Sequence, residues 1–75
     1  MNARSHRTVH GVYSRHAPGH VRDYFLKTVE NGKPSRALAG DLWNCTDILP
    51  GWACDQLDIP TGSTYAQAAR KIVNA

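Results

Sequence analysis

Apolar positions recur at helical spacing most clearly between Pro18 and Pro34. The residues that share one face of this stretch, three or four positions apart, are Val21, Tyr24, Phe25, Thr28 and Val29. Proline is tolerated in the first turn of a helix, where its missing N–H costs nothing. Asn31-Gly32 before Pro34 is a typical helix end, because glycine adopts the left-handed terminal geometry and proline cannot continue a helix. The pattern predicts a helix over residues 19–31.

A second helix is expected to begin after Ser35, whose hydroxyl can cap the free N–H groups of a first turn. The residues predicted on its inner side are Leu38, Ala39, Leu42, Trp43 and Cys45. Gly40 lies inside this stretch and costs about 1 kcal/mol relative to alanine. The second helix is therefore expected to be intrinsically weaker than the first.

The spacing after residue 46 predicts a short third helix. Thr46 and Asp47 are its expected caps, and Pro50 would fall in its first turn. The helix is expected to end at Ile59, because the residue before Pro60 is pushed toward extended geometry. The residues that this helix would bury are Leu49, Trp52, Ala53 and Leu57.

The last segment separates polar from apolar residues and predicts a helix over residues 63–73, capped by Thr61 or Ser63. One arc carries Tyr65, Ala66, Ala68, Ala69, Ile72 and Val73. The opposite arc carries Ser63, Thr64, Gln67, Arg70, Lys71 and Asn74. The two basic residues in the last turns suit the negative end of the helix dipole.

These elements predict a mainly α fold: one small domain of three or four short helices over residues 18–75. Residues 1–17 are expected to form an extended or flexible basic arm. A chain of 75 residues holds a single domain and buries only roughly 60% of the surface of its unfolded state, so its core is thin. The predicted core is Phe25, Leu38, Leu42, Trp43, Trp52, Leu57, Tyr65 and Ile72.

Charge is distributed unevenly along the chain. Nine basic and six acidic residues give a net charge of +3. Residues 1–36 hold seven basic against two acidic residues, a net +5, whereas residues 37–75 hold two against four, a net −2. This asymmetry is typical of a protein that meets a polyanion or an acidic protein through one side. A solvated face that keeps a small protein soluble would give the same pattern.

Metal, cofactor and enzyme chemistry are not predicted. Cys45 and Cys54 lack the closely spaced partners of zinc frameworks, and we expect two buried free thiols. The histidines form two pairs four residues apart, His6 with His10 and His16 with His20, but Gly11, Pro18 and Gly19 interrupt any continuous helix there. No nucleophile elbow, phosphate-binding loop or paired-carboxylate motif occurs, so we expect a non-enzymatic protein.

A cytoplasmic location is expected. No apolar run approaches the roughly 18 residues of a membrane span, so no membrane association is predicted. The first seven residues have no apolar core of the kind that secretory leaders carry.

The favoured function is DNA binding by a small regulatory protein. Residues 52–59, a turn over residues 60–62 and residues 63–72 resemble a helix-turn-helix in order and length. The predicted contacts are Ser63, Thr64 and Gln67 with base edges, and Arg70 and Lys71 with phosphates. The motif departs from its usual form, with Asp58 in place of glycine and with Thr64 and Gln67 at positions that are usually apolar.

The alternative is a protein partner. Trp43 and Trp52 are of the residue type that dominates interfaces, and a small core cannot bury every aromatic side chain. If both tryptophans flank one groove, that groove is the expected interface. The alternative function is that of a phage- or mobile-element-type accessory protein that binds and modulates, or inhibits, a host protein. Homodimerisation is the simplest form of such binding.

Overall fold

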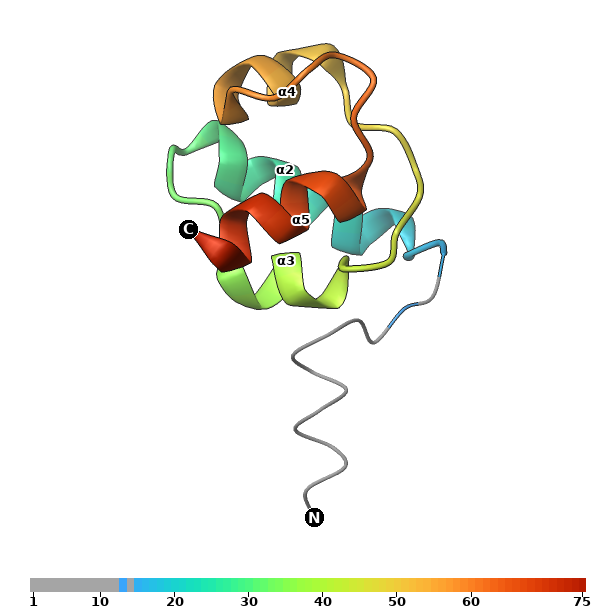
Figure 1. Ribbon diagram of the computed structural model, residues 1–75. Coiled ribbons are helices and arrows are strands. Elements are labelled where there is room, and N and C mark those ends of the chain that lie inside the picture. Colours follow the sequence, from blue (N-terminus) through green and yellow to red (C-terminus); the bar gives the residue numbers. More distant parts are fainter. Residues whose placement is uncertain (1–12, 14) are drawn as a thin grey trace.

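The protein is mainly helical, as predicted. A computed structural model describes Tyr13 and residues 15–75. Its helices are α2 (Gly19–Glu30), α3 (Arg36–Asp41), α4 (Gly51–Leu57) and α5 (Tyr65–Asn74) (Figure 1). Between the described residues a single isolated β-bridge forms, from Ile48 to Thr64. Most of the predicted basic arm, residues 1–12 and Ser14, lies outside the described residues. None of the helices in the described part is long and apolar enough to cross a membrane.

Helix α2 confirms the first predicted helix to within one residue. Pro18 occupies the position before its first turn, and Gly32 ends it with a φ of +80°, the left-handed geometry that glycine adopts at little cost. The N–H of Gly32 returns to the carbonyl oxygen of Val29 at 3.0 Å. Val21, Phe25 and Val29 form the buried face.

Helix α3 begins as predicted and ends early. The Ser35 hydroxyl accepts the N–H of Leu38 at 3.1 Å. The helix stops at Asp41, and turns over residues 42–44 follow it, so Trp43 and Cys45 are not helical, contrary to the prediction. Cys45 is nevertheless fully buried, because the chain turns it back into the core.

The prediction for the start of α4 is wrong. Neither Thr46 nor Asp47 caps it; Pro50 precedes its first residue, and no side chain bonds to its first turn. The N–H of Thr46 instead donates to the carbonyl oxygen of Arg15 at 2.8 Å. The predicted burial of Trp52 is also wrong, since its side chain is 44% exposed, whereas Ala53 is fully buried.

Helix α5 begins at Tyr65, two residues later than predicted. Thr64, not Thr61 or Ser63, is its cap: the Thr64 hydroxyl accepts the N–H of Gln67 at 3.1 Å, and the Gln67 side-chain oxygen accepts the N–H of Thr64 at 2.8 Å. This reciprocal pair is a capping box. The helix then continues to Asn74.

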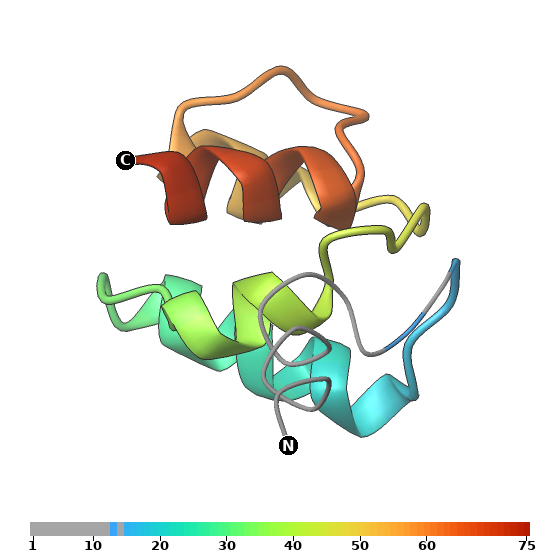
Figure 2. The ribbon, with the colours of Figure 1, turned by 60° about the horizontal axis from the view of Figure 1, so that its bottom comes forward.

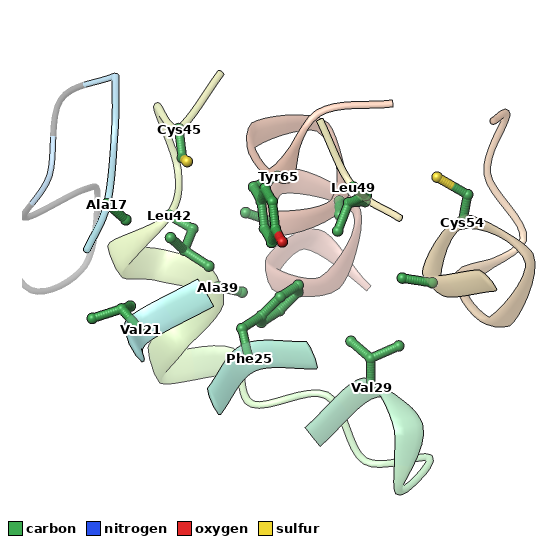
Figure 3. Close-up of a cluster of buried hydrophobic side chains, with 13 residues drawn as sticks. Ala17, Val21, Phe25, Val29, Ala39, Leu42, Cys45, Leu49, Cys54 and Tyr65 are labelled. Carbon is green, nitrogen blue, oxygen red and sulfur yellow. The ribbon is translucent and has the colours of Figure 1, made fainter. Parts of the chain in front are cut away.

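The helices surround one core. Helix α5 packs chiefly against α3, and α4 packs against α2. In the view of Figure 1, α3 lies on one side of α5 and α4 on the other. At the centre, the ring centroids of Phe25 and Tyr65 lie 5.9 Å apart and the ring planes are inclined at 60° (Figure 3).

Both cysteines are buried free thiols, as predicted, at opposite ends of the cluster. Phe25, Leu42 and Tyr65 confirm the predicted core; the residues that are only partly buried are Leu38, Trp43, Leu57 and Ile72.

Candidate functional site

The three residues predicted to meet base edges form the start of α5. Ser63 is only 6% exposed, and its hydroxyl donates to the carbonyl oxygen of Pro60 at 2.6 Å. Thr64 and Gln67 hold each other in the capping box. An open hollow lies beside them, lined by Ser63, Gln67 and the connecting residues 59–62. Thr64 and Gln67 thus start the helix, and Ser63 closes the turn that precedes it.

The two basic residues predicted to meet phosphates contact neighbouring elements. The Arg70 guanidinium lies 5.1 Å from the centre of the Trp43 ring, within the range of a cation–π contact, and 3.5 Å from the side-chain oxygen of Asn44. The Lys71 ammonium donates to the carbonyl oxygens of Leu57 and Asp58, at 2.8 and 3.1 Å. Lys71 thus satisfies carbonyl groups at the C-terminal end of α4, where positive charge is favourable.

The arrangement of α4 and α5 differs from the predicted helix-turn-helix. Seven residues, 58–64, connect the helices in place of the predicted turn over residues 60–62. The segment before α4 pairs with the segment that leads into α5. The Leu49 N–H donates to the backbone carbonyl oxygen of Ser63, and the Tyr65 N–H donates to the backbone carbonyl oxygen of Asp47, both at 2.9 Å. The connection therefore returns along α4, and both helices start near this bridge and run the same way (Figures 1 and 2).

Other basic residues also stabilise the fold. Arg36 donates to the carbonyl oxygens of Ile72 and Val73, at 3.3 and 2.9 Å, and so caps the C-terminal end of α5. Arg22 lies between the carbonyl oxygen of Ala17 at 3.3 Å and the carboxylate of Asp47 at 3.7 Å. With Arg70 and Lys71, four of the seven basic side chains in the described part contact protein groups.

The two tryptophans lie on different elements. Trp43 is half-buried in the turns after α3 and contacts Arg70 of α5. Trp52 is 44% exposed and lies on α4. Neither side chain lines the hollow beside the start of α5, and a groove shared by the two tryptophans stays a prediction.

An exposed apolar segment surrounds Pro50. Ile48 is 59% exposed and Trp52 is 44% exposed, with half-buried Pro50 between them; we call these three residues the α4 entry surface. Ile48 was missed by the sequence analysis. In extended chain successive side chains point to opposite faces, so burial of Leu49, which is 3% exposed, leaves Ile48 outside. The alternation is too short to recognise in the sequence.

Histidine, cysteine and acidic side chains build no candidate metal site among residues 13 and 15–75. No group of three or more metal-ligating side chains gathers there, while His6 and His10 lie outside this part. Cys45 has no access to solvent, and burial raises the pKa of its thiol, which disfavours the nucleophilic thiolate. Comparison with models of known families, with curated proteins and with solved structures finds no match to the chain.

Proposed function

We propose that the chain is a small non-enzymatic protein that binds another protein through the α4 entry surface, with Trp52 at the centre of the contact. The exposed Trp52 side chain carries the proposal. Tryptophan gives a large contact area at low conformational cost and is enriched among the residues that dominate binding energy. In a chain of 75 residues, where every large apolar side chain counts toward a thin core, an indole left 44% exposed forgoes stability.

The use of charged residues supports a protein partner over DNA. Contact with a duplex relies on basic side chains that neutralise phosphates. In the described part, Arg22, Arg36, Arg70 and Lys71 bond to protein groups instead. DNA binding through α5 stays a prediction, and its test is given in the Discussion.

The test is affinity capture with three forms of the protein: wild type, Trp52→Ala and Tyr24→Ala. Tyr24 on α2 is the matched control, because it is an aromatic residue with 61% exposure outside the α4 entry surface. We expect a specific partner that wild type and Tyr24→Ala retain and Trp52→Ala loses, since truncation at a binding hot spot costs on the order of 2 kcal/mol or more. Equal retention by all three forms of every captured protein would contradict the proposal.

A further inference from the structure

A short non-helical strap crosses one end of the core. It consists of residues 15–18 and leads directly into α2. The carbonyl oxygen of Arg15 accepts the N–H of Thr46 at 2.8 Å and the Thr46 hydroxyl at 3.4 Å. Ala17 is only 6% exposed, and its backbone N–H interacts with the Cys45 thiol. Figure 3 shows Ala17 and Cys45 together at this end of the core. The strap therefore covers the Cys45 thiol.

The Asp47 carboxylate joins the strap to the rest of the protein. One of its oxygens lies 3.0 Å from His16 Nδ1 of the strap. The other accepts the Cys45 thiol at 3.4 Å and lies 3.7 Å from Arg22 Nε of α2. A single side chain thus contacts the strap, its own loop and α2.

The loop beneath the strap is held independently of that carboxylate. The backbone carbonyls of Asp47 and Cys45 accept the N–H groups of Tyr65 and Ala66, at 2.9 and 2.8 Å. These main-chain bonds do not involve the side chain of residue 47. The strap is held by the bonds of its Arg15 carbonyl and by the bond from Arg22 Nε to its Ala17 carbonyl at 3.3 Å. Its one side-chain contact with Asp47 comes from His16, whose side chain is 77% exposed. Segments with few buried contacts open locally at low free energy.

We propose that Asp47 is the latch of this strap, and that residues 15–18 open as one unit when the carboxylate is lost or neutralised, while the four helices stay folded. The charged and titratable groups that contact the latch are His16 from the strap, Arg22 from α2 and the Cys45 thiol from the loop. Tyr65 of α5 also interacts electrostatically with Asp47. Opening uncovers Ala17 and the Cys45 thiol.

Amide hydrogen exchange at one fixed pH tests the latch. The reporter is the Thr46 N–H, which bonds to the strap, and the internal control is the Leu49 N–H, which bonds to Ser63. In Asp47→Ala we expect Thr46 to exchange roughly tenfold faster, the factor that corresponds to one hydrogen bond to a charged group. In Asp47→Asn, which keeps an acceptor oxygen and loses the charge, we expect the Thr46 exchange rate to lie between those of Asp47→Ala and wild type. The exchange rate of the Leu49 N–H is expected to be the same in both variants as in wild type.

Histidine variants give a second, milder test. We expect His16→Ala to speed Thr46 exchange about twofold, because exposed ion pairs contribute little, and the matched variant His20→Ala to leave it unchanged. We also expect His16→Ala to raise the rate at which a thiol reagent labels Cys45 relative to Cys54, the buried thiol at the far end of the core.

Acceleration of Thr46 and Leu49 amide exchange by the same factor would show that the strap opens only with the whole domain. Unchanged Thr46 exchange in both Asp47 variants and in His16→Ala would show that Asp47 is no latch. Either result overturns the proposal.

Discussion

The Lys71 ammonium of α5 donates a 2.8 Å hydrogen bond to the carbonyl oxygen of Leu57, the last residue of α4. The neighbouring carbonyl, of Asp58, accepts a second bond at 3.1 Å. Asp58 itself has a φ of +59°, so the chain turns sharply where the two helices are linked. Lys71, which the sequence predicted to contact a DNA phosphate, thus connects the end of α4 to the last turns of α5.

Loss of this contact is expected to lower stability. Lys71→Ala removes the donor from two helix-terminal carbonyl groups, and we expect the free energy of unfolding to fall by about 1 kcal/mol. Lys27→Ala is the matched control, because Lys27 has no ion pair or side-chain hydrogen bond to another described residue. Urea unfolding of both variants measures the difference. Equal stabilities of the two variants would contradict the structural role of Lys71.

DNA binding through α5 makes a separate prediction. If Arg70 and Lys71 neutralise phosphates, a labelled generic duplex binds at about 50 mM salt, and its affinity falls steeply by about 200 mM. Arg70→Ala and Lys71→Ala would each lower the salt slope by roughly one unit. Fluorescence anisotropy measures both quantities. Failure of the folded wild-type protein to bind at the lower salt concentration would contradict DNA binding.

The capping box predicts a graded pair of variants. Thr64→Ala removes the acceptor for the Gln67 N–H, and we expect a loss of roughly 0.5–2 kcal/mol in the free energy of unfolding. Thr64→Ser keeps the hydroxyl and is expected to stay close to wild type. Thermal unfolding followed by circular dichroism compares them. If the two variants were equally destabilised, the methyl group of Thr64, not its cap, would be the stabilising feature.

Features set by neighbouring residues could be predicted from the sequence, and features set by distant partners could not. The bounds of α2 and the Ser35 cap depend on groups within one helical turn. The start of α4 does not: Thr46 and Asp47 bond to Arg15 and His16, which lie 31 residues away. Sequence periodicity does not show that residues so far away bind Thr46 and Asp47, so both residues resembled ordinary helix caps.

The candidate site shows the same limit. A polar stripe on α5 was predicted correctly as a pattern, but the pattern cannot distinguish side chains that meet a ligand from side chains that cap helices. Thr64 and Gln67 form the capping box, and Lys71 contacts the end of α4. The exposure of Trp52 depends on how α4 lies against α2, which follows from long-range packing.

Two glycines are expected to respond in opposite directions to alanine. Gly51 opens α4 with a negative φ and no atom within 4 Å of an added Cβ, so Gly51→Ala should stabilise the protein by about 0.5–1 kcal/mol. Gly62 has a φ of +93°, a geometry that strains any residue with a Cβ. Gly62→Ala should therefore destabilise it by about 1 kcal/mol or more. Urea unfolding gives both values, and a shift of the same sign for both would contradict the assigned geometries.

Asp47 and Asp41 are expected to affect the pH dependence of stability with opposite signs. The hydrogen bond from His16 holds the pKa of the Asp47 carboxyl below its usual range. Its stabilisation is therefore complete above the unfolded-state pKa, about 3.9, and is lost as the pH falls through the lower folded-state value. Burial instead raises the pKa of Asp41, so folding disfavours its charged form, and stability is gained as the pH falls through that raised value.

Asparagine variants separate the two effects. At about pH 7, Asp47→Asn is expected to lower the free energy of unfolding, because it removes a favourable charge. Asp41→Asn is expected to raise it, because it removes a charge that is partly desolvated at the last residue of α3, where the helix dipole is also unfavourable. As the pH falls through each folded-state pKa, the carboxyl group becomes neutral, first that of Asp41 and then that of Asp47, and both differences from wild type should shrink. The measurement is urea unfolding from about pH 7 to about pH 2.5. A difference for Asp47→Asn that stayed constant across this range would show that the side chain stabilises the protein by shape and not by charge.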